Sequence, residues 1–255
     1  MNHQGGEETA MTLTEHLTDL RYRIVKCLQG LFVGVAIGIY FSEPLLALIR
    51  KPILPYLTNG GLVFTGVMDK FLAHLKVGVL GGVILTCPYW LYHVWKFISP
   101  GLYKHERKYA AAFIVFGSGL FLTGVCFVYF FVYPAAFKYL LAVGGDIDKP
   151  MITIDAYLGF FTLTTLMFGL SFELPIVLTL LAMMGIVDSA FLRKQRRYAV
   201  VILAVVSAIL TPPDLISMLM MLVPMILLYE SSIWVIHFFV PRPAAAVAAG
   251  NEEPA

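Results

Sequence analysis

The chain has 255 residues, of which 59% are hydrophobic and only 13% are charged, and its formal net charge is +2. Soluble domains are about 45–50% apolar and about 25% charged. This composition therefore excludes an ordinary soluble domain and predicts an all-α integral membrane protein in contact with a lipid bilayer. The nearly balanced charge is not that of a nucleic-acid-binding protein.

Six apolar runs are candidate transmembrane helices, within a single membrane domain that covers residues 1–240. The first four reach the roughly 20 residues that a helix needs to cross a bilayer. The fifth extends only about 20 Å at about 1.5 Å per residue. It is followed by the break signal "TPPD", and Glu230 interrupts the sixth. We therefore expect six transmembrane helices, the last two of them short. The runs are 24–41, 74–98, 109–133, 158–184, 198–210 and 215–236.

Basic residues predict the orientation in the membrane. Twelve of the 18 Lys and Arg residues lie on the side that holds the amino terminus, and six lie on the opposite side. Because basic loops are retained in the cytoplasm, both termini are predicted to be cytoplasmic. The tail at 241–255 is rich in Pro and Ala and has too little apolar content to pack, so we expect it to be disordered.

The stretch before the first span, "TLTEHLTDLRYRIVKCL", predicts a helix in its own right, because leucines recur at three- and four-residue intervals. Asp19 stands four residues before Arg23, which is the spacing of an intrahelical ion pair. From chemistry alone, such a solvated pair is the simpler interpretation of this acid.

The first span contains a ridge of glycines, Gly30, Gly34 and Gly38, at a helical spacing of four. A ridge of this kind lets another helix approach closely. We expect it to pack within this protein, and a partner helix is the alternative.

The first predicted cytoplasmic loop is strongly basic. It places Glu106 among Lys104, His105, Arg107 and Lys108, after the break "SPG". An acid in this setting is ordinarily neutralised by its neighbours.

One acid, Glu173, lies in the middle of the apolar run "LMFGLSFELPIVLTLL" at 166–181. A charge at mid-bilayer costs about 2.5–3.5 kcal/mol or more, so such residues face protein or water and mark function. The alternative is a protonated acid that hydrogen-bonds a neighbouring helix.

Asp214 ends the "TPPD" turn, directly before the sixth run. It is placed to cap the amino end of that helix. A contact with a partner at this turn, which includes Pro212, is the alternative.

The chain closely resembles the TatC family, the multispanning receptor subunits of the twin-arginine protein translocase. The resemblance extends from about Leu13 to Phe239 and is carried by four segments. These are "HLTDLRYR" at 16–23, "CPYWLYHVWKFISPGLYKHER" at 87–107, "FGLSFELPIV" at 168–177 and "ILTPPDLIS" at 209–217. It implies a glove-shaped fold in the cytoplasmic (inner) membrane.

The resemblance also implies recognition of signal peptides that carry two adjacent arginines. The family's recognition acids correspond to Asp19 and Glu106, although the family usually has Glu at the first position. A guanidinium pairs with a carboxylate through two hydrogen bonds, which lysine cannot reproduce. The neighbouring bases are expected to hold these acids in place, and they are Arg21, Arg23, Lys104 and Arg107. Phe97 either packs the residues beside the arginine pair or is an interfacial aromatic.

For Glu173 the resemblance implies a polar contact for partner or substrate helices on the concave face. The implied partners are the small single-span TatA and TatB proteins, further copies of the chain, and folded substrates, with the proton gradient as the energy source. No nucleotide loop, metal-ligand cluster or nucleophile constellation is visible, so we expect neither an enzyme nor a cofactor. The alternative function is a proton-coupled secondary transporter with Glu173 as relay, but the sequence has no evident repeats or paired broken helices.

Overall fold

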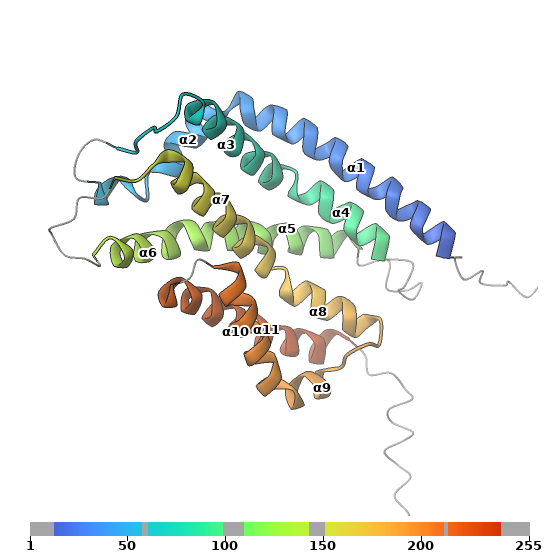
Figure 1. The fold of residues 1–255 in the computed structure, drawn as a ribbon. Coiled ribbons are helices and arrows are strands. Elements are labelled where there is room, and N and C mark those ends of the chain that lie inside the picture. Colours follow the sequence, from blue (N-terminus) through green and yellow to red (C-terminus); the bar gives the residue numbers. More distant parts are fainter. Residues whose placement is uncertain (1–12, 58–60, 99–109, 143–150, 212–213, 241–255) are drawn as a thin grey trace, which may run out of the picture.

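A computed structural model describes residues 13–57, 61–98, 110–142, 151–211 and 214–240, and almost all of them are helical. Figure 1 shows α1, α3 and α4 along one edge, α5 and α6 across the middle, and α8, α10 and α11 on the far side. Helix α7 crosses between these layers. The elements are α1 (Leu13–Tyr40), α2 (Ser42–Arg50), a 3-10 turn (Leu54–Tyr56), α3 (Asp69–Leu85), α4 (Cys87–Ile98), α5 (Ala110–Phe127), a π-helical turn (Val128–Val132), α6 (Tyr133–Leu140), α7 (Ile154–Ser171), α8 (Leu174–Met183), α9 (Ser189–Lys194), α10 (Arg196–Leu210) and α11 (Leu215–Phe239).

Four of the described helical segments are long and apolar enough to cross a membrane, and a bent pair makes a fifth. The prediction of six spans exceeds this number because α10, the predicted fifth span, has only 15 residues. The segments are Leu17–Tyr40, Ala111–Leu140, Ile154–Met183 and Leu215–Phe238, with Asp69–Leu85 and Cys87–Phe97 as the bent pair.

The prediction that the last two helices are both short is wrong for α11, which has 25 residues. Glu230 does not interrupt this helix, because its Oε2 pairs with Nη2 of Arg196 at 2.7 Å, at the start of α10. One turn of the helix is also reinforced by the Ser232 hydroxyl, which donates to the Leu228 carbonyl at 2.6 Å. The proline inside α11, Pro224, is accommodated without ending it.

The predicted helix before the first span is confirmed, and α1 continues from it without a break into that span. The expected internal packing of the glycine ridge is confirmed. A Cβ atom on Gly38 would lie 2.2 Å from the carbonyl oxygen of Gly78, and one on Gly34 would lie 2.9 Å from that of Gly82. Helices α1 and α3 therefore touch through their backbones.

Two runs that were each predicted as one helix are broken. The run 74–98 forms α3 and α4, which meet at an angle of 56°, and the run 158–184 forms α7 and α8. Pro88 and Pro175 follow the breaks by one or two residues, and neither can donate the backbone hydrogen bond that continues a helix. The second break sets Glu173 between α7 and α8.

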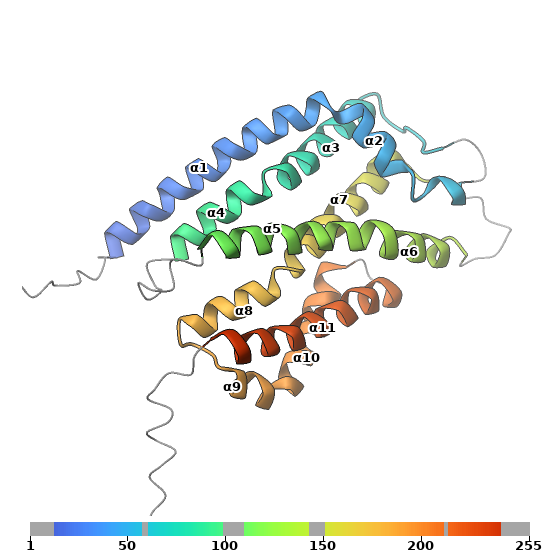
Figure 2. The same ribbon diagram turned by 180° about the vertical axis from the view of Figure 1, so that it is seen from behind.

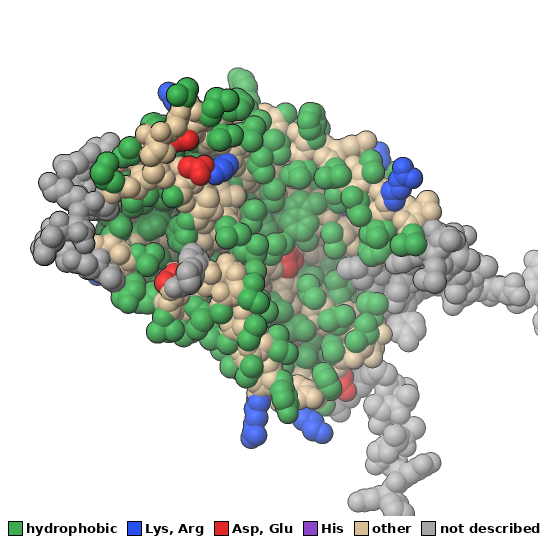
Figure 3. All heavy atoms as spheres, viewed as in Figure 1, with side chains coloured by type: hydrophobic (Ala, Val, Ile, Leu, Met, Phe, Trp, Pro, Cys, Tyr) green, Lys and Arg blue, Asp and Glu red, His purple; other side chains and the backbone are tan. Residues whose placement is uncertain are grey.

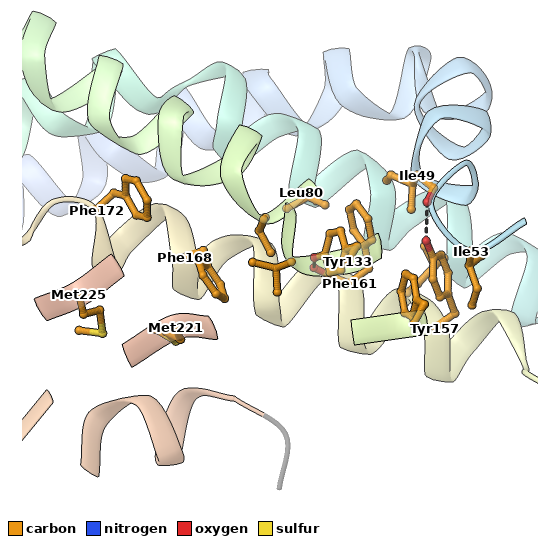
Figure 4. Close-up of a cluster of buried hydrophobic side chains, with 14 of the residues drawn as sticks. Ile49, Ile53, Leu80, Tyr133, Tyr157, Phe161, Phe168, Phe172, Met221 and Met225 are labelled. Carbon is orange, nitrogen blue, oxygen red and sulfur yellow. Dashed lines mark hydrogen bonds between the residues drawn. The ribbon is translucent and has the colours of Figure 1, made fainter. Parts of the chain in front are cut away.

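Tyrosine hydroxyls tie the core together. The Tyr157 hydroxyl on α7 donates to the Ile49 carbonyl at the end of α2, as Figure 4 shows. The fully buried Tyr133 hydroxyl donates to the Phe161 carbonyl and lies within hydrogen-bond distance of the Thr165 hydroxyl, both at 2.7 Å. Each bond satisfies a polar group that would otherwise be unpaired in an apolar interior.

The helix ends divide the molecule into two sides. Figures 1 and 2 show the start of α1, the end of α4 and the start of α5 together on one side, and α2 and the end of α6 on the opposite side. Hydrophobic side chains cover most of the face drawn in Figure 3 between them. This is the surface of a protein surrounded by lipid.

Candidate functional site

Asp19 lies near the amino end of α1 and is paired within the helix. Its Oδ2 accepts a hydrogen bond from Nε of Arg23 at 2.6 Å. The Arg23 side chain is 12% exposed and that of Asp19 is 21% exposed. The predicted ion pair is confirmed, but it is more buried than a solvated surface pair.

The carboxyl end of α4 lies beside this part of α1. The Tyr89 ring packs so closely on Gly30 that a Cβ there would lie 2.3 Å from it. One turn later His93 is buried, and its ring packs edge-on against that of Tyr89 with centroids 4.7 Å apart. The end of α4 therefore lies on the same side of the molecule as the start of α1 (Figure 1).

The remaining predicted recognition residues are described only in part. Phe97 is half-buried at the end of α4, and Arg21 is exposed on α1. Lys104, Glu106 and Arg107 lie outside the described residues.

Glu173 occupies the break between α7 and α8 and is only 7% exposed. Its Oε1 is buried and has no hydrogen-bond partner within the described part of the chain. Gly117 on α5 faces the carboxylate, and a Cβ at that glycine would lie 3.2 Å from Oε2. The missing side chain at Gly117 thus leaves room for the acid.

The Glu173 carboxyl group borders a cavity of about 260 Å³ between α4, α5 and the α7–α8 pair. Apart from the acid, the lining is almost entirely apolar. A carboxyl group in such surroundings needs a hydrogen-bond donor to offset its loss of hydration. The lining residues are Trp90, Leu91, Val94, Trp95, Phe113, Ile114, Leu170, Ile176, Val177 and Leu180.

Sequence reasoning missed two polar neighbours of this site. Cys87 is fully buried at the start of α4, and Ser118 is buried on α5 next to Gly117. Ser118 donates to the Ile114 carbonyl at 2.7 Å. The aromatic run "CPYWLYHVWKF" was the available signal, because it places Cys87, Trp90 and Trp95 on one short helix.

Asp214 caps α11 as predicted, since its Oδ1 accepts the backbone N–H of Ser217 at 2.7 Å. Its second oxygen, Oδ2, is buried and unpaired among the described residues. Pro212 lies outside the described residues.

These features define a helical, multi-pass membrane protein with isolated acids at the membrane edge and within the bilayer. No group of three or more His, Cys, Asp or Glu side chains within the described ranges is placed to hold a metal ion. Such isolated acids suit binding of cationic or hydrogen-bonding groups better than bond-breaking chemistry.

The family model of the Sec-independent protein translocase protein TatC matches residues 15–224, and the chain belongs to this family. It is similar to the TatC protein of Desulforapulum autotrophicum, with 39% identity over 89% of this chain and 84% of that protein. It is also similar to TatC of Escherichia coli strain K12, with 36% identity over 92% of each chain.

A solved structure of a twin-arginine translocase receptor, TatC in the detergent DDM, superposes with a TM-score of 0.77 at 32% identity. The match covers 87% of this chain and 99% of that one. The chain is therefore a component of the Sec-independent translocase and not an enzyme. The alternative of a proton-coupled transporter fails on this comparison.

Proposed function

We propose that this chain is the receptor for twin-arginine signal peptides and the scaffold on which the translocase assembles. The observation that supports this most directly is the position of Asp19, a carboxylate at the membrane edge beside the end of α4. From there the chain runs into the basic loop that contains Glu106. Two arginines on two acids supply charge-assisted hydrogen bonds of about 1.5–3 kcal/mol each.

In this proposal Arg21, Lys104 and Arg107 hold the two acids before a substrate arrives, and Phe97 packs beside the arginine pair. The chain forms one membrane domain over 1–240 in the cytoplasmic membrane, with both termini inside and six crossings in a glove-shaped arrangement, of which α10 is the short fifth one. This orientation is supported by the described helix ends, because the start of α1, the end of α4 and the start of α5 lie together on one side (Figures 1 and 2). Arg21, Arg23 and Lys96 lie on the amino-terminal side.

Glu173 is proposed to be the contact for incoming helices, from single-span partners of the TatA and TatB type, from another copy, or from the substrate. Its support is the unpaired Oε1 beside an apolar cavity. A helix that enters with a polar side chain supplies the missing donor, worth about 0.6–2 kcal/mol in a membrane. Asp214 and Pro212 are proposed as a second contact at the opposite side, where Asp214 has an unpaired oxygen.

The test is binding of a labelled twin-arginine peptide to the full chain in nanodiscs. Asp19→Asn and Glu106→Gln keep the size of each side chain and remove only its charge. Because each substitution removes about 1.5 kcal/mol or more of binding free energy, each variant should bind the peptide tenfold or more weakly. A twin-lysine peptide should bind poorly to the unmodified chain. Unchanged binding by the double variant would contradict the proposed recognition site.

A further inference from the structure

The carboxylate of Asp19 is already occupied by a guanidinium from its own helix. The Oδ2···Nε distance to Arg23 is 2.6 Å, at the short end for a charge-assisted hydrogen bond. Both side chains are largely buried, so water screens this pair less than an exposed one. An incoming arginine needs the same carboxylate oxygens.

We propose that Arg23 is a resident ligand of Asp19, which a signal-peptide arginine must displace in order to bind. The inference rests on the proposed function. It means that the peptide arginine replaces Arg23 at the Asp19 carboxylate and does not simply bind an unoccupied acid. One guanidinium replaces another, so the carboxylate stays paired in both the empty and the occupied receptor.

The surroundings of the pair favour exchange over a shared site. Arg23 is only 12% exposed and lies in direct contact with Asp19. A second guanidinium at the same carboxylate would meet repulsion from Arg23 at close range unless Arg23 moved away. The Lys26 ammonium itself is turned toward the Tyr22 ring, 5.6 Å from its centroid, so it does not substitute for Arg23.

Occupancy by Arg23 has a quantitative consequence. An apparent affinity falls by the fraction of receptor whose site is free. An i,i+4 ion pair worth about 0.3–1 kcal/mol corresponds to a factor of about two to five. That factor is the same for every peptide, so arginine and lysine peptides should lose affinity equally and their ratio should not change.

The experiment measures dissociation constants of twin-arginine and twin-lysine peptides for the full chain in nanodiscs at one fixed salt concentration. Arg23→Gln should tighten both peptides about two- to fivefold and leave their ratio unchanged. Arg23→Lys keeps the charge but loses the planar fork, so it should give a smaller gain. Lys26→Gln removes the same charge one turn away without freeing Asp19, and it should leave both constants unchanged.

Three results would overturn the inference. Weaker or unchanged binding by Arg23→Gln would mean that Arg23 positions the acid instead of competing for it. Equal tightening by Lys26→Gln would mean that only long-range charge is at work. Normal binding by Asp19→Asn would refute the proposed recognition site itself, and the inference with it. Melting temperatures of the variants, measured in parallel, separate these outcomes from misfolding.

Discussion

The contact between α1 and α3 predicts that adding a single carbon atom to Gly38 will destabilise the protein. In the Gly38→Ala variant the new Cβ would lie 2.2 Å from the carbonyl oxygen of Gly78 and 3.1 Å from the Gly82 nitrogen. Contacts under 3.0 Å do not occur at real Cβ atoms. The obstructing atoms are backbone, so no side-chain rotation relieves them, and the two helices must separate.

The magnitude follows from two opposing effects. Overpacking a tight contact costs about 1–3 kcal/mol or more, and replacing a helical glycine by alanine recovers about 1 kcal/mol of backbone entropy. A rigid neighbour places the overpacking cost at its upper end, so the net loss should be about 2 kcal/mol. Gly119 and Gly159 are matched controls on α5 and α7, because a Cβ at either meets no atom within 4 Å. Alanine at these positions should stabilise.

The assay is thermal unfolding in detergent, followed by a thiol-reactive dye. Cys87 is fully buried and reports unfolding, whereas Cys27 and Cys126 are more accessible and are replaced by serine in the background chain. The Gly38→Ala variant should melt several degrees below the background, and both control variants at or above it. If Gly38→Ala melted together with Gly119→Ala, the close approach of α1 and α3 would be wrong.

Three further predictions address other parts of the chain. Glu173→Leu should insert and bind twin-arginine peptide normally yet reduce export of a twin-arginine reporter, with Glu173→Gln between it and the unmodified chain; full export by the leucine variant would make this acid structural. Asp214→Ala removes the hydrogen bond to the Ser217 N–H and should cost about 0.5–2 kcal/mol, measured by the same dye assay, while Asp214→Asn should retain most of the stability. Reporter fusions after Gly60 should be external and those after Lys104 internal, and an external result at Lys104 would reverse the orientation.

The sequence predicts those parts of the fold that depend on local spacing. Glycines four apart predicted the close helix contact, Asp19 and Arg23 predicted an ion pair, and the acid that follows "TPP" predicted the cap of α11. Each depends on groups within one or two turns, where helix geometry fixes the distances.

Features that depend on single prolines or distant partners were missed. A hydropathy window of about 20 residues averages over Pro88 and Pro175, so the breaks that they cause in two runs do not appear in it. Glu230 in the sequence indicates an interruption of the sixth run, whereas in the structure it pairs with Arg196 from another helix and α11 continues to Phe239. The cavity beside Glu173 needs α4, α5 and α8 together, and no local pattern encodes their meeting.

Asp19 and Glu173, the two acids of the proposed function, differ in how the surrounding residues compensate their charge. Asp19 lies at the membrane edge and takes its counterion from the next turn of the same helix. Glu173 lies among apolar side chains, where Gly117 leaves space but supplies no donor, and its Oε1 is unpaired among the described residues. In the proposed exchange at Asp19, one ion pair is released for each one that forms, so the net free energy gained there is smaller than that of the new pair alone. A donor that reached Glu173 would break no pair that the structure describes, so the full free energy of that hydrogen bond would favour binding.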